Sequence, residues 1–257
     1  MPADGGEPKN LVKLPEGALA WFKHSPDGKW IVASFRVQPE NRTSTAAKKR
    51  EEDGLSSPPW ELTNLWNRLD GDGFFGEARF HLYLINAETG EHKVLYDQDA
   101  MGFASCDWLP DSSGLIVCHS KGKTPWMELP DSHFSRVDLK GKAKPIKTGV
   151  KGPKGTLRVS PDGKNLAWLG TDVVEPWGAP SERVWMMPLD GSSSAVCLTA
   201  DHDLDFGNMT LSDCNFGFVS DGGGSGFLAW SPDGSKLYSA VGQHGEVQLV
   251  SLDPATK

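Results

Sequence analysis

One turn sequence recurs four times along the chain and constrains the fold more than any other feature. It is Ser-Pro-Asp-Gly at residues 25–28, 160–163 and 231–234, and Leu-Pro-Asp-Ser-Ser-Gly at residues 109–114. Proline presets φ for the first turn position, aspartate can hydrogen-bond its own backbone two residues on, and glycine accepts a positive φ. Apolar and β-favouring residues follow each copy, so each copy is expected to be the turn of a β-hairpin.

A second strand pair follows the turn in most units. Residues 81–91 and 183–191, and more weakly 134–141, each show an apolar run that leads into a short polar turn. Two hairpins per unit make the four-stranded blade of a β-propeller. No stretch has the pattern of an amphipathic helix of four turns, and 29 glycines with 18 prolines fit a turn-rich chain. We therefore predict an all-β fold of about four propeller blades, each of four antiparallel strands, in an incomplete ring.

The blades are expected to form a single domain over residues 1–257. Their spacing is uneven because of two insertions. The first, at about 38–59, is polar and charged and is predicted to be an exposed or partly disordered loop. The second, at about 201–226, carries a flexible glycine tract. The predicted blade units lie at about 17–98, 101–148, 155–200 and 227–257.

The chain has ten tryptophans, which is many for its length. Large rings fill the wedge between adjacent sheets, and this packing role is expected of four of them: Trp108, Trp168, Trp185 and Trp230. Three others fall in expected loops, where they could line a central or inter-domain pocket: Trp66, Trp126 and Trp177.

The charge balance argues against a nucleic-acid partner, and the hydropathy pattern argues against a membrane span. The formal net charge is −8, and the basic run 48–50 is followed at once by the acidic run 51–53, which indicates a solvated loop. No stretch approaches the roughly 18 apolar residues of a membrane span, and residues 1–10 lack the apolar segment of a signal peptide, so a cytoplasmic location is expected. The four cysteines are expected to be buried free thiols: Cys106, Cys118, Cys197 and Cys214.

Two acidic segments suggest metal sites at first sight. Asp70, Asp72 and Glu77 fail the calcium-loop spacing, because Phe75 stands where glycine is needed and His81 where the bidentate glutamate should be. A turn with solvated carboxylates is the favoured interpretation.

Residues 201–205, Asp-His-Asp-Leu-Asp, could coordinate a cation, but a surface loop is favoured because no second ligand cluster is marked. The seven histidines show no metal-ligand spacing, and no Cys/His couple stands out as a nucleophile pair. The sequence thus predicts no catalytic, cofactor-binding or metal-binding residue and no cofactor.

The repeats resemble those of TolB-like propellers and of the propellers in the prolyl oligopeptidase family of serine peptidases. Segment 61–83, with Asp-Gly-Asp-Gly-Phe at 70–74 ahead of a strand that leads to Thr-Gly-Glu at 89–91, is similar to the first-blade hairpin of the acylaminoacyl-peptidase and dipeptidyl-peptidase branch. Residues 197–200, 212–213 and 229–234 follow the same order as in that branch. The resemblance covers about residues 17–252.

In that family an α/β-hydrolase domain follows the propeller and carries the catalytic serine in a Gly-x-Ser-x-Gly turn. The nearest match here, residues 223–227, lacks the final glycine and has no strand–helix context, so the hydrolase domain is expected to be absent from this chain. The resemblance implies a non-catalytic propeller portion that gates peptide access to a hydrolase domain, with that domain or a peptide as partner.

Two other functions stand beside this interpretation. One is a stand-alone TolB-like module that binds a protein partner. The other, a sugar- or lipid-processing hydrolase, is disfavoured because no paired carboxylates have a credible spacing. An unclosed propeller would also expose strand edges, so self-association is expected.

Overall fold

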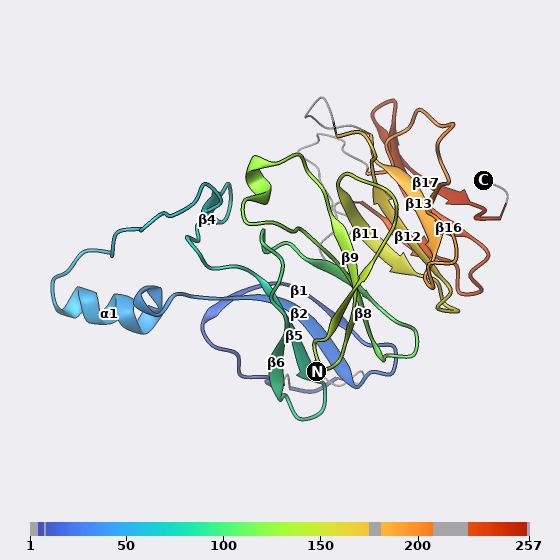
Figure 1. Ribbon diagram of the computed structural model, residues 1–257. Helices are drawn as coiled ribbons and strands as arrows, with labels where there is room; N and C mark the ends of the chain where they lie inside the picture. The colour runs from blue at the N-terminus through green and yellow to red at the C-terminus, as the bar shows by residue number, and fades with distance from the viewer. Residues whose placement is uncertain (1–4, 8, 175–180, 208–225, 256–257) are drawn as a thin grey trace. The chain divides into compact units, whose positions relative to one another are not determined.

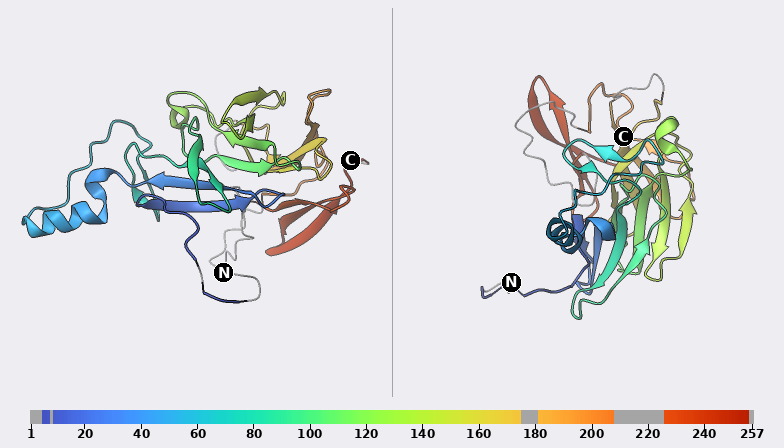
Figure 2. Two further views of the ribbon diagram at one scale, coloured as in Figure 1. Left: turned by 90° about the horizontal axis from the view of Figure 1, so that it is seen from below. Right: turned by 90° about the vertical axis from the view of Figure 1, so that its left-hand side faces the viewer.

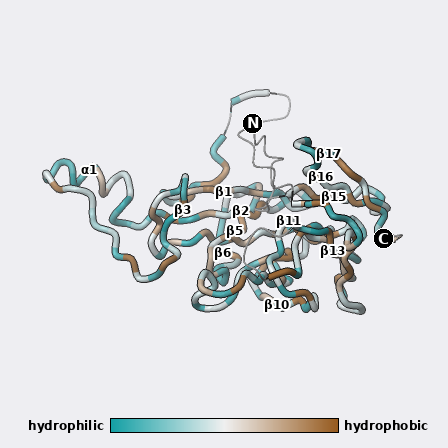
Figure 3. Tube along the Cα trace, turned by 90° about the horizontal axis from the view of Figure 1, so that it is seen from above, coloured by the Kyte–Doolittle hydropathy of each residue, from teal (hydrophilic) through white to brown (hydrophobic). Residues whose placement is uncertain are grey.

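A computed structural model describes residues 5–7, 9–174, 181–207 and 226–255 of the chain (Figure 1). The chain divides into two compact units, Met1–Asp97 and Gln98–Lys257. Both are built from antiparallel sheets in which hydrophobic and hydrophilic residues are mixed along the strands (Figure 3).

The first unit contains one four-stranded blade with the strand order β1-β2-β5-β6. Its strands are β1 (Gly17–His24), β2 (Trp30–Val37), β5 (His81–Asn86) and β6 (His92–Tyr96). A small core forms where β2 and β5 pair, and it consists of Ile31, Ala33 and Ile85 with Val12 packed against them.

The connection from β2 to β5 holds a helix that the sequence interpretation missed. It contains η1 (Glu40–Arg42), α1 (Ser44–Glu52) and a small hairpin of β3 (Arg68–Leu69) and β4 (Gly73–Phe74). The expected loop at 38–59 is therefore wrong in part. Helix α1 has no buried residue, so it lacks the apolar periodicity that predicts a helix. Figure 2 shows it extending away from the sheet of its own unit.

Capping accounts for the start of α1. The Thr43 hydroxyl accepts a hydrogen bond from the backbone N–H of Ala46, and the Glu16 carboxylate accepts two from the backbone N–H and hydroxyl of Ser44. Such contacts satisfy amide groups that the first helical turn leaves open. No helix of the described residues is long and apolar enough to cross a membrane.

The second unit contains three blades that follow one another along the chain. The first is β7 (Ser105–Trp108), β8 (Gly114–His119), β9 (His133–Asp138) and β10 (Ala143–Ile146). The second is β11 (Lys154–Val159), β12 (Asn165–Gly170), β13 (Arg183–Pro188) and β14 (Val196–Cys197). The third has three strands among the described residues: β15 (Leu228–Trp230), β16 (Leu237–Gln243) and β17 (Glu246–Leu252). A short helix, η2 (Pro125–Met127), lies between β8 and β9.

All four repeated turns join the first and second strands of a blade, as predicted. At 160–163 the Ser160 hydroxyl accepts from the N–H of Asn165 (2.9 Å) and donates to the Asp162 carboxylate (2.6 Å). Gly163 has φ of 71°, the left-handed conformation that the turn requires. In the variant turn, Ser112 adopts φ of 58° in its place.

Two cores lie between the blades of the second unit. One is formed by residues from β8, β9, β11, β12 and β13, and it includes Phe134, Trp168 and Trp185. The other lies between the blade of β11–β14 and that of β15–β17. Trp230 packs against this second core and its ring N–H donates to the carbonyl of Arg158 in β11, 3.3 Å away. Trp168, Trp185 and Trp230 thus pack between blades as predicted, and Trp108 is buried.

The two ends of these blades differ in construction. We call the end that carries the Pro-Asp turns the turn end, where the first strand of each blade meets the second. At the opposite end, which we call the loop end, connections run from the second strand to the third and from one blade to the next, and all of them except the two-residue β16–β17 turn are longer than the Pro-Asp turns. The loop-end connections that the structure describes throughout are 98–104, 120–132, 147–153 and 244–245. The connections from β12 to β13 and from β14 to β15 are described only in part, over 171–174, 181–182, 198–207 and 226–227.

Candidate functional site

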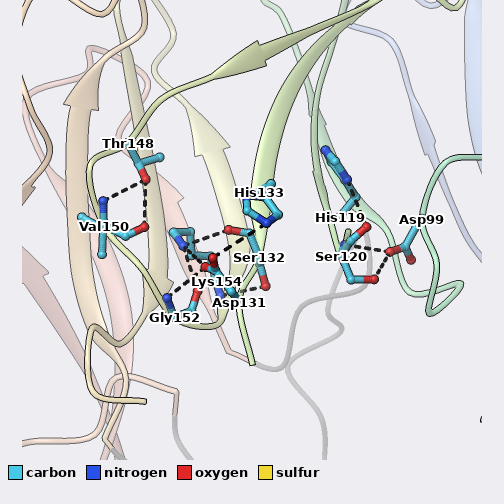
Figure 4. A network of polar contacts seen from close by, with 10 residues as sticks. All are labelled: Asp99, His119, Ser120, Asp131, Ser132, His133, Thr148, Val150, Gly152 and Lys154. Atoms are coloured by element: carbon cyan, nitrogen blue, oxygen red, sulfur yellow. Dashed lines mark hydrogen bonds and ion pairs between the residues drawn. The ribbon is translucent and has the colours of Figure 1, made fainter. Parts of the chain in front are cut away.

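The loop end of the second unit holds a network of buried polar groups (Figure 4). Asp99, which is buried, accepts hydrogen bonds from the backbone N–H of Ser120 (2.8 Å), from the Ser120 hydroxyl and from the backbone N–H of Phe103. A carboxylate with three donors compensates for its loss of hydration. Asp99 thereby fixes the 98–104 connection to the 120–132 loop.

Lys154, at the start of β11, joins the next pair of loops (Figure 4). Only 1% of its side chain is exposed. Its ammonium donates to the carbonyls of Ser132 and Gly152, both 2.8 Å away, and to Oδ1 of Asp131 at 3.2 Å. All three ammonium donors therefore have acceptors, and the 120–132 and 147–153 loops are held together by one buried cation.

Two histidines stand opposite each other where β8 ends and β9 begins. The rings of His119 and His133 are 6.2 Å apart. Burial lowers the pKa of His119, with the positive charge of Lys121 adding to the effect. Burial also lowers the pKa of His133, although the nearby Asp131 carboxylate opposes the shift. Both imidazoles are therefore neutral at pH 7.

His119 makes one contact that has the geometry of a nucleophile and base. Its Nε2 lies 3.0 Å from the hydroxyl of Ser135. Its Nδ1, however, faces the carbonyl of Ser120 at 3.3 Å, whereas a catalytic triad needs a carboxylate there. Ser135 is 3% exposed within strand β9, so a substrate carbonyl has no access to its hydroxyl. The pair is a structural hydrogen bond.

The Cys118 thiol is also unreactive because it is buried. It donates to the carbonyl of Lys154, and burial raises its pKa to about 12. A thiol with so high a pKa is not a nucleophile at neutral pH. Cys106 is a buried free thiol as predicted, whereas Cys197 is a free thiol that is only half-buried, and Cys214 lies outside the described residues.

One residue of the acidic segment 201–205, Asp205, lies near the buried carboxyl of Glu182 at the loop end. Oδ1 of Asp205 accepts hydrogen bonds from the backbone N–H of Glu182 (2.8 Å) and of Gly207 (3.2 Å). Burial, and then the charge of Asp205, raise the pKa of Glu182 to about 7. Asp201, His202 and Asp203 are exposed and do not join this pair. No group of three potential metal ligands occurs in the part of the chain that the structure describes.

The three other acidic candidates, all in the first unit, have different surroundings. The Asp70 side chain is fully exposed at the β3–β4 turn. Both oxygens of Asp72 accept from Arg36, at 2.6 and 2.7 Å, and these hydrogen bonds hold the pKa of Asp72 below its usual value. Glu77 instead accepts from the side-chain amide of Asn64. The turn is as predicted, but Asp72 is an ion-pair partner and not a solvated carboxylate.

No sequence pattern indicates the partner of Asp72, since Arg36 lies 36 residues away. The Arg36 guanidinium also stacks over the ring of Phe80 at 4.5 Å and that of Phe75 at 5.3 Å. It therefore ties the hairpin insertion to β2 through charge and aromatic contacts.

The three loop tryptophans belong to different parts of the chain. Trp66 packs against Phe75 in the first unit, Trp126 is half-buried in η2, and Trp177 lies outside the described residues. A cavity of about 600 Å³ in the first unit is lined by Trp60, over which Arg42 stacks at 3.4 Å. Of the serine-turn look-alike at 223–227, residues 223–225 also lie outside the described part.

No protein-family model matches the sequence, and no curated protein matches it. Solved structures are nevertheless similar to it. One is a puromycin-hydrolyzing peptidase of Mycobacterium tuberculosis, with a TM-score of 0.58 and 16% identity over 98% of this chain and 33% of that chain. Another is the acylaminoacyl peptidase of Pyrococcus horikoshii, with a TM-score of 0.56 and 13% identity over 92% of this chain and 30% of that chain.

A looser likeness, with a TM-score of 0.48 and 14% identity, extends to TolB of Acinetobacter baumannii over 93% of this chain and 55% of that chain. At such identities the two peptidase matches show the fold, and they confirm the predicted propeller blades and their structural resemblance to acylaminoacyl peptidase. The chain spans about a third of the length of either peptidase.

Proposed function

We propose that this chain is the non-catalytic propeller portion of a serine peptidase similar to acylaminoacyl peptidase, and that it gates peptide access to an α/β-hydrolase domain outside this chain. The observation that carries the proposal is the unequal coverage of the two structural matches. Nearly all of this chain corresponds to only 30–33% of each peptidase. A portion of that kind supplies a scaffold, and the chemistry belongs to the remainder of the protein.

The polar network supports the same proposal. The contact between His119 and Ser135, beside this network, is buried, and the other ring nitrogen of His119 faces a backbone carbonyl instead of a carboxylate. The hydrogen bonds of Asp99 and Lys154 in this network connect one loop to another, which is a structural role. Free thiols at Cys106 and Cys118 fit a reducing compartment, and the proposal places the protein in the cytoplasm.

The test compares this chain with the complete product of the gene that encodes it. We expect the complete product to hydrolyse acyl-amino-acid or dipeptidyl chromogenic substrates, with activity abolished by a serine-directed inhibitor, and residues 1–257 alone to be inactive. Inhibitor-sensitive turnover by residues 1–257 would overturn the proposal. A gene product without a hydrolase domain would also overturn it, and would favour the TolB-like interaction module.

Gating has its own readout. If the propeller restricts access by size, the complete product should cleave short peptides at least tenfold faster, in kcat/KM, than unfolded chains of about 30 residues with the same terminal sequence. Equal rates would contradict gating while leaving the peptidase assignment in place.

We also propose that residues 1–257 alone self-associate through open strand edges. Strand β17 lies at the edge of the sheet of β15–β17 and exposes Val247 and Leu249. An apolar edge strand is a template for pairing with another chain. Light scattering should show oligomers that grow with concentration, and a monomer with a cooperative melt would contradict this.

A further inference from the structure

The insertion between β2 and β5 of the first unit contains the cavity of about 600 Å³, which we call the insertion cavity. Its lining comes entirely from residues 39, 41, 42, 58–61 and 75–78, so it lies within one unit and outside the four strands of the blade. Ligand pockets in proteins typically measure roughly 300–1,000 Å³. The apolar part of the lining consists of prolines and aromatic rings: Pro39, Pro58, Pro59, Trp60 and Phe75.

One arginine in this lining is fixed in place but lacks an anionic partner. Nη2 of Arg42 donates to the carbonyls of Pro58 (2.8 Å) and Pro59 (3.0 Å). Its guanidinium carbon lies 3.4 Å from the centre of the Trp60 ring. Nη1 and Nε have no hydrogen-bond partner, and no carboxylate pairs with Arg42, among the residues that the structure describes. A half-buried guanidinium with free N–H groups is a binding group for a carboxylate.

A second arginine that holds the same insertion has its anion within the chain. Both oxygens of Asp72 accept hydrogen bonds from Arg36, at 2.6 and 2.7 Å. Arg42 is held by backbone carbonyls instead, so its position does not depend on an internal carboxylate and its remaining donors face no competing anion.

Two glutamates give the insertion cavity an acidic side, Glu61 and Glu77. Oε1 of Glu77 accepts hydrogen bonds from the Thr63 hydroxyl and from the side-chain amide of Asn64, which orients the carboxylate. Oε2 of Glu77 has no partner in the described part of the chain, and Glu61 pairs with no cation there. The lining therefore holds one positive and two negative groups, which opposes a purely anionic ligand and favours one that carries both charges.

The tryptophan of the lining is packed closely against the backbone of the insertion. Gly76 has φ of 58°, and a Cβ at that position would lie 3.0 Å from the Trp60 ring. The Phe74 ring also lies near Trp60, with 6.1 Å between the ring centres. Because Arg42, Gly76 and Phe74 already restrict this ring, a ligand that packs against it loses little additional side-chain entropy.

We propose that the insertion cavity binds a short zwitterionic peptide of two or three residues. The terminal carboxylate pairs with Arg42, the ammonium group lies on the side of Glu61 and Glu77, and an apolar side chain packs against Trp60 and the neighbouring prolines. The inference goes beyond the proposed function and does not rest on it, because every lining residue belongs to this chain.

The first experiment varies the ligand and leaves the protein unchanged. The complete gene product, treated with a serine-directed inhibitor so that the ligand is not hydrolysed, is titrated calorimetrically with leucyl-phenylalanine, with its C-terminal amide and with its N-acetyl derivative. We expect the amide, which lacks the carboxylate, to bind at least tenfold more weakly than the dipeptide, and the N-acetyl derivative, which lacks the ammonium, at least threefold more weakly.

Three results of this titration would overturn the inference. The first is no binding of leucyl-phenylalanine, and the second is tighter binding of its N-acetyl derivative. The third is displacement of the dipeptide by inorganic phosphate at equal concentration, which would indicate a site for simple anions.

The second experiment assigns the binding to Arg42. Arg42→Gln should reduce the preference for the dipeptide over its amide to less than twofold, because the charged fork that reads the carboxylate is gone. Arg50→Gln is the matched control and should keep the preference at tenfold or more. Arg50 belongs to the same insertion, donates to the carbonyl of Ser56 at 3.4 Å and does not line the cavity.

The thermal midpoint of each variant without ligand separates a lost ligand contact from a lost fold. Arg42→Lys keeps the charge and a donor for the proline carbonyls but not the fork. If Arg42→Gln does not fold, Arg42→Lys provides the test, and its preference for the dipeptide should fall to about threefold.

The two proposals fail separately. An active gene product in which Arg42→Gln and the parent show the same preference overturns the binding inference and leaves the proposed function standing. A gene product without a hydrolase domain that still binds the dipeptide through Arg42 overturns the proposed function alone.

Discussion

The two ends of the blades in the second unit are ordered in different ways. At the turn end, each Pro-Asp turn is closed by hydrogen bonds within about six residues, as between Ser160 and Asn165. At the loop end, the contacts that fix the backbone join residues 21 and 23 positions apart, Asp99 with Ser120 and Lys154 with Asp131. The turn end is therefore specified locally, and the loop end depends on the assembled blades.

The difference also concerns burial. Aspartates of the turn end, such as Asp162 and Asp233, are exposed and accept hydrogen bonds from nearby serine and backbone groups. At the loop end, Asp99 and Lys154 are buried, so each depends on partners from another loop. Removing one group should perturb a single turn at one end and several connected loops at the other.

The largest expected effect is that of Lys154→Met. It leaves the carbonyls of Ser132 and Gly152 and the Asp131 carboxylate without their donor, and should lower the free energy of unfolding by about 3 kcal/mol. Urea denaturation measures this loss.

Lys164→Met is the matched control, because Lys164 pairs with Asp162 at the turn end with 79% of its side chain exposed. An exposed pair contributes little, so the change should stay within about 0.5 kcal/mol. Equal losses in the two variants would remove the distinction between the ends.

The next effect concerns Glu182, whose buried carboxyl has a pKa raised to about 7. Between its ordinary value near 4.5 and this raised value the folded state binds more protons than the unfolded chain, so this group destabilises the protein progressively as the pH rises from about 5 to 8. Glu182→Gln removes the ionisation. The stability of the variant relative to the parent should increase by on the order of 2 kcal/mol between pH 5 and pH 8, and a difference independent of pH would contradict the assignment.

A smaller effect tests how local the turn end is. Gly163→Ala forces a Cβ into a turn residue with φ of 71° and should cost about 1 kcal/mol of stability. The nearest atoms to that Cβ belong to Pro110, at 3.7 Å, so the cost is conformational and not a clash. Gly155→Ala, which meets nothing within 4 Å and has no positive φ, is the control and should be neutral or stabilising. Thermal melts of both variants make the comparison.

The smallest effect separates the ends by pH. Burial lowers the pKa values of His119 and His133 in the folded state, so the unfolded chain binds protons at a higher pH than the folded protein does. The free energy of unfolding therefore decreases as the pH falls below about 6.5. At the turn end, hydrogen bonds from Ser160 and from the backbone of Lys164 lower the pKa of Asp162, so its contribution to stability is lost only as the pH falls below about 4. The pKa of Asp233 is lowered to about 2, so its contribution is lost between about pH 4 and pH 2.

Two substitutions assign these windows. His119→Asn should flatten the pH dependence of unfolding between pH 7 and pH 5, and Asp162→Asn should flatten it below pH 4. If both variants altered the same window, the assignment of one window to each end would be wrong.

The turn end of the blades could be predicted from the sequence. Proline, aspartate and glycine at fixed spacing specify the turns, and all four formed between first and second strands. Even the variant turn formed, although Ser112 must adopt a positive φ where the other copies have glycine. The tryptophans between blades were predictable because ring size and β-strand context favour inter-sheet packing.

The contacts between residues far apart in the chain, which order the loop end, were not predictable from one sequence. Lys154 sits in an ordinary Pro-Lys-Gly stretch, and nothing in that stretch indicates that its ammonium will be buried against Asp131. The Arg36–Asp72 pair was missed for the same reason. Helix α1 was missed because it is stabilised at its N-terminus by Thr43 and Glu16, while pattern analysis looks for a buried face.

That capped helix has a practical consequence. Since no residue of α1 is buried, its C-terminal turn and the residues that follow, about 49–55, contribute nothing to the packing of the blade. A fluorophore, an affinity tag or a whole reporter domain inserted there should leave the sheet of β1, β2, β5 and β6 intact. The start of α1 is held by the hydrogen bond from Ser44 to the Glu16 carboxylate. A label at 49–55 would therefore be an external reference point from which distances to the rest of the protein can be measured in solution.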